Sequence, residues 1–149
     1  LSHVTKQDRE LFCEQLKMLD MGLEDRLRQP VGLLSGGQRQ ALTLMMATIA
    51  KPKLLLLDEH TAALDPGAAE KVLALTTRIA KENSLTCLMV THNMRSALAL
   101  GNRTLMMDRG GIVLDVSGDE RAHMDVQDLL ERFKAGVGQT LDNDRMLLS

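Results

Sequence analysis

Four consecutive leucines followed by two acids, at positions 54–59, fix the fold class of this 149-residue chain more firmly than any other segment. A short unbroken apolar run is typical of a buried strand in a parallel sheet, where both faces are covered. The carboxyl end of such a strand lies at the sheet edge where α/β proteins bind ligands. We therefore predict an α/β fold with Asp58 and Glu59 at its functional edge.

The segments after Glu59 complete the pattern of a parallel sheet. A helix is predicted over 66–81, with Pro66 at a favoured first-turn position, and a strand over 86–91. Asn93 opens a short helix before a strand at 103–108. Arg109, Gly110 and Gly111 form a hairpin turn into a strand at 112–116. A helix over 125–134 and a polar tail after Gly136 follow.

Two helices are predicted ahead of the leucine strand. The first covers 6–21, is capped by Thr5 or Ser2, and ends at Gly22. The second runs from Ser35 to about residue 50, where Pro52 forces a break. The residues predicted to face the core are Leu11, Phe12, Leu16 and Leu19 in the first helix, and Leu42, Met45, Met46 and Ile49 in the second.

Composition narrows the possible functions. The chain is 44% hydrophobic but only 1% aromatic, so leucine and methionine must fill the core. Its net charge of −2 gives no general attraction for nucleic acid, and we expect none as a partner. Cys13 and Cys87 form no C-x-x-C pair and are expected to be reduced thiols. No apolar stretch approaches the roughly 20 residues of a membrane span.

Residues 34–38 read Leu-Ser-Gly-Gly-Gln and stand at the start of the second helix. A serine and two glycines at a helix start expose backbone N–H groups at its positive end, which favours an anion. Together with the apolar strand that ends in Asp58 and Glu59, this motif resembles the ATP-binding subunits of ABC transporters. Their signature motif is LSGGQ, and their Walker B motif is four apolar residues followed by Asp and Glu.

The resemblance implies a P-loop NTPase fold of the ABC-ATPase type. We expect part of it here: a RecA-like, mostly parallel sheet with flanking helices, plus the end of the helical subdomain. Residues 1–34 would end the helical subdomain, 35–118 would form the signature helix and the C-terminal half of the ATPase core, and 119–149 a C-terminal helical extension. The first helix would either touch membrane-spanning subunits or simply cover the core.

A phosphate-binding loop of the form G-x-x-x-x-G-K-[ST] is absent, because no Gly-Lys dipeptide occurs in the 149 residues. Gly32 to Gly37 has the glycine spacing, but Gln38 stands where lysine is needed. We expect the chain to be the C-terminal fragment of an ATPase subunit, without its Walker A motif and glutamine loop. A degenerate member of the family is the alternative.

The resemblance assigns roles to the acids and to one histidine. Asp58 would hold Mg²⁺, typically through water, and Glu59 would act on the attacking water. Successive side chains of a strand point to opposite faces, which agrees with two different roles. His92, which follows an apolar strand and Thr91, stands at the position of the family's switch histidine and would bond the γ-phosphate. His3, His60 and His123 receive no such role.

Residues 61–65, Thr-Ala-Ala-Leu-Asp, resemble the family's D-loop, which crosses the dimer interface. Asp65 would belong to that loop, and it also suits a helix cap before Pro66. His60 departs from the family, in which proline is most frequent after the two acids. The change is expected to alter the stiffness of the loop and its backbone donors without touching the catalytic groups.

In this family the signature contacts the ATP of a second subunit. Ser35, Gly36, Gly37 and Gln38 would therefore face an ATP held by a partner, in a head-to-tail dimer with two nucleotides. The implied cofactors are ATP and Mg²⁺, and the implied partners are a second ATP-binding subunit and membrane-spanning permease subunits. The expected location is the cytoplasmic face of the membrane, as a peripheral protein. We expect the fragment alone to be largely inactive.

The segments DEHTAALDP and THNM and the tail NDRMLLS resemble ATP-binding subunits of bacterial amino-acid importers. Two alternatives from other classes stay open. One is a soluble ABC ATPase that acts in DNA repair or on ribosomes. The other is a non-catalytic interaction module, favoured if Leu1 is the true start.

Overall fold

The computed structural model describes residues 4–147, and the side chains of residues 4–136. The chain divides into two compact units, residues 1–90 and residues 91–149. Each unit has its own sheet, parallel in the first and antiparallel in the second.

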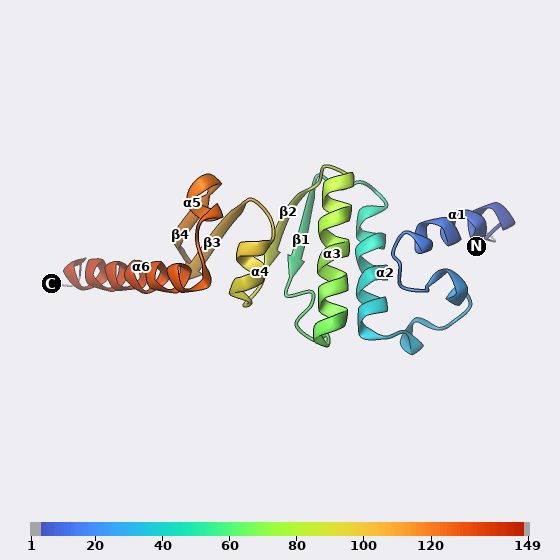
Figure 1. Ribbon diagram of the computed structural model, residues 1–149, viewed down its shortest axis with the longest axis horizontal. Coiled ribbons are helices and arrows are strands. Elements are labelled where there is room, and N and C mark those ends of the chain that lie inside the picture. Colours follow the sequence, from blue (N-terminus) through green and yellow to red (C-terminus); the bar gives the residue numbers. More distant parts are fainter. Residues whose placement is uncertain (1–3, 148–149) are drawn as a thin grey trace. The chain divides into compact units, whose positions relative to one another are not determined.

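The first unit is built around a β-α-β crossover. Its elements are α1 (Lys6–Lys17), the 3₁₀ turns η1 (Glu24–Arg26) and η2 (Val31–Leu33), α2 (Gly36–Thr48), β1 (Leu54–Asp58), α3 (Pro66–Glu82) and β2 (Thr86–Val90). Strands β1 and β2 pair in parallel, with Leu54 opposite Thr86 and Asp58 opposite Val90. Helices α2 and α3 lie side by side next to this sheet (Figure 1). The predicted strand–helix–strand order is confirmed.

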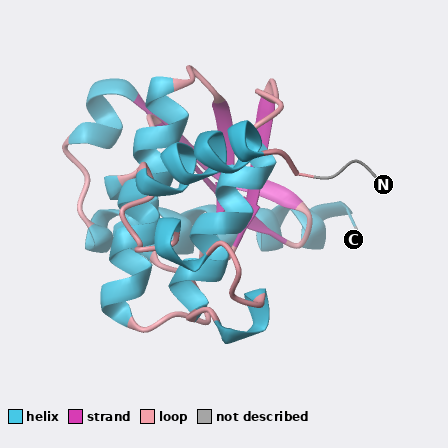
Figure 2. Ribbon diagram, turned by 90° about the vertical axis from the view of Figure 1, so that its right-hand side faces the viewer, coloured by secondary structure: helices cyan, strands magenta, loops and turns pink. Residues whose placement is uncertain are grey.

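The core of the first unit consists almost entirely of leucine, as the low aromatic content requires. Figure 2 looks from the side of α1 and shows the helices of this unit in front of its two strands. The buried cluster joins the end of α1 and the turns after it to α2, β1 and α3; it contains Leu16, Leu19, Leu23, Leu34, Ala41, Leu44, Leu55 and Leu75.

The first predicted helix is too long. Helix α1 begins after Thr5, whose side chain caps it in a reciprocal box with Asp8. It ends at Lys17, and the chain then turns through Asp20 and Gly22, which both have positive φ. Leu19 is therefore buried from the turn rather than from the helix. Two residues predicted to face inward, Leu11 and Phe12, are exposed.

The inward face of α2 also differs from the prediction. Gly37, Ala41 and Leu44 are buried, whereas Met46 and Ile49 are exposed. Leu42 and Met45 are half-buried at the edge of the core, as predicted. Small residues on this face let α2 approach α3 closely. They, rather than Met46 and Ile49, therefore determine which face of α2 is turned toward the core.

Strand β1 is covered on one face rather than two in the part of the chain that the structure describes. Leu55 is buried and Leu57 half-buried, but Leu54 and Leu56 are 49% and 65% exposed. On the neighbouring strand Leu88 and Val90 are each 51% exposed. The prediction that the leucine strand is buried on both faces is therefore wrong for β1 within these residues.

The second unit combines a β-hairpin with three helices. Its elements are α4 (Met94–Ala99), β3 (Arg103–Asp108), β4 (Gly111–Ser117), α5 (Gly118–Ala122) and α6 (Val126–Leu147). Asp108 pairs with Gly111, so the turn is Arg109 and Gly110 alone, both with positive φ. Gly111 belongs to the strand, because left-handed conformations at two successive residues already close a hairpin.

Arg121 of α5 holds the C-terminal end of α4. Its Nη2 donates to the carbonyl oxygens of Ala97, Leu98 and Leu100 at 3.1, 2.7 and 2.5 Å. Its Nε donates to Thr104 Oγ1 of β3 at 2.8 Å. One guanidinium therefore satisfies carbonyl groups that a helix end leaves without intrahelical donors.

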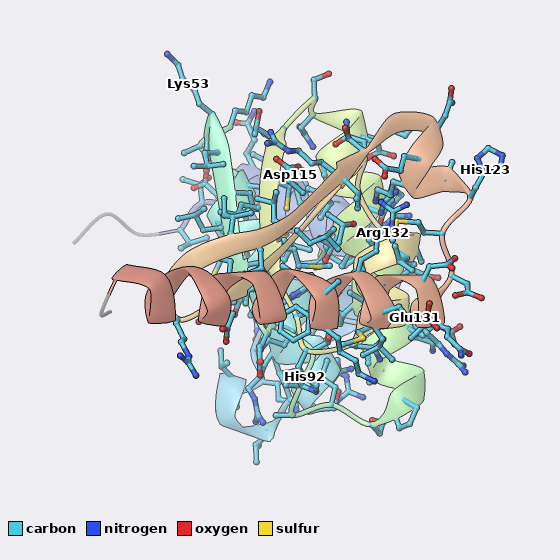
Figure 3. The ribbon with its side chains drawn as sticks, turned by 90° about the vertical axis from the view of Figure 1, so that its left-hand side faces the viewer. Lys53, His92, Asp115, His123, Glu131 and Arg132 are labelled. Carbon is cyan, nitrogen blue, oxygen red and sulfur yellow. The ribbon has the colours of Figure 1, made fainter. Side chains whose placement is uncertain are left out.

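Helix α6 continues well past the predicted end at residue 134. It runs to Leu147, so the predicted polar tail after Gly136 is helical in its backbone. Near its middle, a Cβ at Gly136 would lie 2.7 Å from the carbonyl oxygen of Val113 in β4. The glycine thus serves close packing against the hairpin and does not end the helix. Figure 3 shows α6 in front of the hairpin, with Arg132 labelled on the helix; that residue pairs with Glu120.

Candidate functional site

The signature residues form the capped start of α2. Ser35 Oγ accepts the backbone N–H of Gln38 at 3.2 Å, and Gln38 Oε1 accepts the backbone N–H of Ser35 at 3.0 Å. The side-chain Nε2 of Gln38 also donates to the backbone oxygen of Met21 at 3.0 Å. The box uses the serine oxygen as an acceptor, which leaves the hydroxyl proton for another group. The local geometry therefore fixes Ser35 at the positive end of a helix of 13 residues.

The two glycines of the signature allow a close approach between this helix start and the loop that precedes α3. A Cβ at Gly36 would lie 2.9 Å from Leu64 Cδ2. A Cβ at Gly37 would lie 3.1 Å from Ala68 Cβ and 3.5 Å from Met21 Cε. The signature thus packs directly against the segment that contains Asp65. Sequence reasoning did not identify Leu64 or Met21 as neighbours of the signature, because neither carries a polar group.

Strand β1 delivers the two acids as predicted. Asp58 ends the strand and is exposed, and Glu59 follows it. Glu59 adopts a left-handed backbone conformation with φ 41°, which is uncommon for a residue with a side chain. Its N–H donates to Val90 O at 3.0 Å, and its carbonyl oxygen accepts the N–H of Ala62 at 2.9 Å. The chain therefore turns sharply at Glu59, away from the direction of the strand.

Asp65 closes this turn as the N-cap of α3. Its Oδ1 accepts the N–H of Ala68 at 3.0 Å, and Pro66 follows at the first helical position. The capping function predicted for Asp65 is confirmed. Its role as a D-loop residue stays a prediction.

His60 is a second anchor of the turn, and sequence reasoning missed it. Its Nε2 lies 3.1 Å from Thr76 Oγ1 in the middle of α3. Burial holds the pKa of the His60 ring below its usual 6.5, because the charged form loses hydration there. Nothing in the local sequence marks Thr76 as the partner, since the two residues are 16 positions apart.

His92 (labelled in Figure 3) lies in the loop between β2 and α4, and it belongs to the second unit. The next residue, Asn93, donates its N–H to Thr91 Oγ1 at 3.0 Å and caps α4 through Ser96 N at 3.0 Å. The other candidates, Ser35 to Gln38, Asp58, Glu59 and Asp65, lie in the first unit. The structure brings the signature and the segment with Asp65 together within the first unit. His92 belongs to the second unit, and its position is described within that unit.

The donors present fit a nucleotide phosphate and Mg²⁺. The first-turn N–H groups of a helix have no acceptor within it, and here they stand beside the Ser35 hydroxyl. Asp58 offers an exposed carboxylate, a hard oxygen ligand suited to Mg²⁺. No group of three or more His, Cys, Asp or Glu residues gathers for a metal in the described part of the chain. Mg²⁺ usually takes one or two carboxylates, with water and phosphate as its other ligands, so one exposed carboxylate is enough for its protein contact.

Comparison with known proteins decides the family. Residues 4–62 match the family model for ABC transporters. A tyrosine transport ATP-binding protein of Clostridioides difficile is 47% identical over 122 residues, which is 82% of this chain and 49% of that protein. The chain belongs to the ABC-type nucleotide-binding domains.

Other relatives of this ABC-type domain agree. An aliphatic sulfonates import ATP-binding protein of Yersinia pestis is 41% identical over 107 residues, 71% of this chain and 40% of that protein. The chain therefore spans about half, or less, of the length of the curated relatives it matches.

Solved structures show the same fold. An ABC transporter in an inward-facing conformation superposes with a TM-score of 0.69 and 28% identity, over 90% of this chain and 52% of that chain. The ADP form of MJ1267, an ATP-binding cassette, gives 0.66 and 23% identity over 78% of this chain and 45% of that chain. The predicted α/β fold of a partial ABC-type P-loop NTPase is confirmed. Among the described residues, no helix has the length and apolar character needed to cross a bilayer.

Proposed function

We propose that these residues are the signature-bearing part of the ATP-hydrolysing, energy-coupling subunit of an ABC importer, with amino acids as the transported class. Support for import comes from relatives whose names describe tyrosine transport and sulfonate import. Those names favour transport over a soluble ABC ATPase of DNA repair or ribosomes.

One observation carries the proposal: the capped start of α2 packs against the loop that leads from Glu59 to Asp65. Two motifs with roles at one phosphate site thus share a surface, although more than twenty residues separate Gly36 from Leu64. A Cβ at position 37 would crowd Ala68 Cβ, and one at position 36 would displace the end of the Leu64 side chain. This close packing favours glycine at both positions, although helix propensity disfavours it.

The start of α2 suits the terminal phosphate of an ATP held by a second subunit. In this proposal the Ser35 hydroxyl and the N–H groups of Gly36 and Gly37 donate to phosphate oxygens. Gln38 acts one step away: it holds Ser35 through the capping box and anchors to Met21 O. The positive end of the helix adds a favourable field for the anion.

The acids divide the hydrolytic work. Asp58 would hold Mg²⁺ through water, and when bound this ion neutralises charge on the transferred phosphoryl group. Glu59 would orient and deprotonate the attacking water, and His92 would donate a hydrogen bond to the γ-phosphate. Asp65 would contribute from the D-loop at the dimer interface. Phosphoryl transfer requires this separation between charge neutralisation and activation of the nucleophile.

These 149 residues do not complete an ATP site by themselves. They supply no Gly-Lys-Ser/Thr loop, so a complete ATP site needs a P-loop from outside them. We propose a head-to-tail dimer of ATP-binding subunits, docked on membrane-spanning permease subunits at the cytoplasmic face. Residues 1–34 would belong to the helical subdomain, 35–118 to the ATPase core, and 119–149 to a C-terminal extension.

The test compares ATP hydrolysis by this chain alone with hydrolysis by a chimera. In the chimera, the N-terminal half of the Clostridioides difficile tyrosine transport ATP-binding protein precedes residue 1. We expect no hydrolysis above background from the chain alone and Mg²⁺-dependent hydrolysis from the chimera. Glu59→Gln in the chimera should lower kcat by at least a hundredfold and leave ATP binding intact.

Two results would contradict the proposal. Equal hydrolysis by the chain alone would mean that it contains a nucleotide site of its own. A folded chimera that binds ATP, dimerises and never hydrolyses it would favour a non-catalytic interaction module instead. Ser35→Ala in the chimera separates the roles, since it should weaken ATP-dependent dimerisation while each subunit still binds ATP.

A further inference from the structure

The side chain of His60 ties the turn between β1 and α3 to the middle of helix α3. Its Nε2 lies 3.1 Å from Thr76 Oγ1. Thr76 is only 5% exposed and lies in the middle of the 17-residue helix α3. A half-buried ring on the turn is therefore joined to a buried position of α3.

The direction of this hydrogen bond follows from counting protons. Thr76 Oγ1 donates to Val72 O at 2.8 Å, the usual bond of a threonine within a helix. A hydroxyl has one proton, so its oxygen must act as the acceptor toward His60. His60 Nε2 therefore carries a hydrogen and donates it to Thr76.

The residue that precedes His60 has the least favourable backbone conformation in the turn. Glu59 has φ 41°, a left-handed value that most side chains avoid. Such a conformation persists only where the surroundings impose it. Two backbone hydrogen bonds contribute, to Val90 O and from Ala62 N. The tether lies at His60, directly after Glu59, and opposes relaxation of the turn into an ordinary conformation.

We propose that His60 is the positioning residue of Glu59: its Nε2–H bond to Thr76 pins the turn to α3 and maintains the left-handed backbone that aims the Glu59 carboxylate. The catalytic value of that aim rests on the proposed function, whereas the tether itself does not. The inference gives a role to a residue that the motif resemblance left without one, and it identifies Thr76 as its partner.

The test uses the ¹⁵N-labelled 149-residue chain with two matched variants. Thr76→Val keeps the shape of the side chain and removes the acceptor, whereas Thr76→Ser keeps the acceptor. Long-range proton–nitrogen spectra of the His60 ring should show hydrogen on Nε2 in the wild type and in Thr76→Ser. Amide–water exchange at Glu59 and Ala62 should accelerate at least fivefold in Thr76→Val and less than twofold in Thr76→Ser.

Controls separate the tether from general loss of stability. The amides of Leu55 and Leu57 in β1 should keep their exchange rates in Thr76→Val. If that variant unfolds, His60→Ala provides the same test from the less buried partner, and it should accelerate the same two amides. Two results overturn the proposal. One is hydrogen on Nδ1 alone in the wild type, and the other is unchanged amide exchange at Glu59 and Ala62 in both Thr76→Val and His60→Ala.

The chimera supplies the catalytic readout. His60→Ala and Thr76→Val should lower kcat at least tenfold, with KM for ATP within twofold of wild type. Thr76→Ser, which keeps the acceptor, should leave kcat near the wild-type value. If the chimera never hydrolyses ATP but the exchange results hold, the proposed function fails and the tether stands. If hydrolysis depends on Glu59 but kcat ignores both tether variants, the positioning role fails and the proposed function stands.

Discussion

At the scale of single residues, Ser35 combines two tasks that one substitution can separate. Its oxygen caps α2, and its proton is the proposed phosphate donor. Ser35→Ala removes both and should lower the free energy of unfolding by about 1 kcal/mol, the usual cost of losing such a cap. Ser35→Asp keeps a cap acceptor without the hydroxyl proton, so its stability should stay near wild type.

The measurement for these two variants is urea unfolding followed by circular dichroism, because the chain contains no tryptophan or tyrosine. Equal stability loss in Ser35→Ala and Ser35→Asp would show that the cap is not what Ser35 contributes. In the chimera both variants should weaken ATP-dependent dimerisation, since neither carries the hydroxyl proton.

His60 predicts a pH dependence with a definite sign. Burial lowers the pKa of the folded ring below 6.5, so the unfolded chain takes up the proton first as the pH falls. This contribution to stability is complete above about pH 6.5 and is lost as the pH falls through the folded pKa. The urea midpoint should therefore decrease between pH 7.5 and 5.5.

His60→Gln is the matched control for this pH effect, because glutamine offers an N–H donor and does not titrate in this range. The variant should show a smaller decrease in midpoint than the wild type. His3, His92 and His123 are the same in both proteins, so the comparison isolates position 60. An identical decrease in both proteins would rule out His60 as the source.

Local rules explain why some of these residues could be predicted from the sequence. The pairing of Ser35 with Gln38, and of Asp65 with Ala68, spans three positions and follows from helix start chemistry. His60 and Thr76 are 16 positions apart, and their contact depends on how the turn folds back over α3. Without that geometry, His60 carries no signal beyond its departure from the usual family residue.

At the scale of elements, Arg121 makes α4, α5 and β3 one structure within the second unit. Its guanidinium reaches three carbonyl groups and a hydroxyl at once. Lysine carries the same charge on a single nitrogen and cannot form this fork. Arg121→Lys should lower the free energy of unfolding by about 2 kcal/mol, the cost of losing charged hydrogen bonds.

Arg132→Lys provides the control for Arg121→Lys. Arg132 pairs with Glu120 at the surface, where both side chains are about half exposed, so the change should cost well under about 1 kcal/mol. Both variants are compared by chemical unfolding, and by the chemical shifts of α4 amides. Similar losses in the two variants would mean that the α4 carbonyls do not depend on the guanidinium.

The elements themselves were more predictable than their ends. The strands at 54–58 and 103–108 match the predicted bounds, because apolar runs and flanking turn residues define them locally. Helix α6 extends past residue 134 since Gly136, a residue that often ends helices, packs against Val113 instead. Its role depends on a contact between distant segments, which periodicity does not contain.

At the scale of the whole chain, the uncovered face of the parallel sheet sets its behaviour in solution. Leu56 pairs with Leu88 and Asp58 with Val90, so Leu56, Leu88 and Val90 lie on one face, together with Leu54. All four side chains are about half exposed or more. Contiguous apolar surface of this kind marks a region that other protein surface covers. A two-stranded sheet is also marginal without further packing.

We therefore expect the isolated 149-residue chain to self-associate as its concentration rises. Leu56→Lys places a charge at the centre of the exposed face and should weaken association about tenfold, which corresponds to about 1.4 kcal/mol. Leu33→Lys is the control, because Leu33 is 69% exposed but lies in η2, away from the sheet. Sedimentation velocity over a range of concentrations measures the effect.

A chain that stays monomeric at every concentration, or that responds equally to both variants, would show that this sheet face is stable in water. In the chimera the added half should cover the same face, so Leu56→Lys should there lower folding stability instead of association.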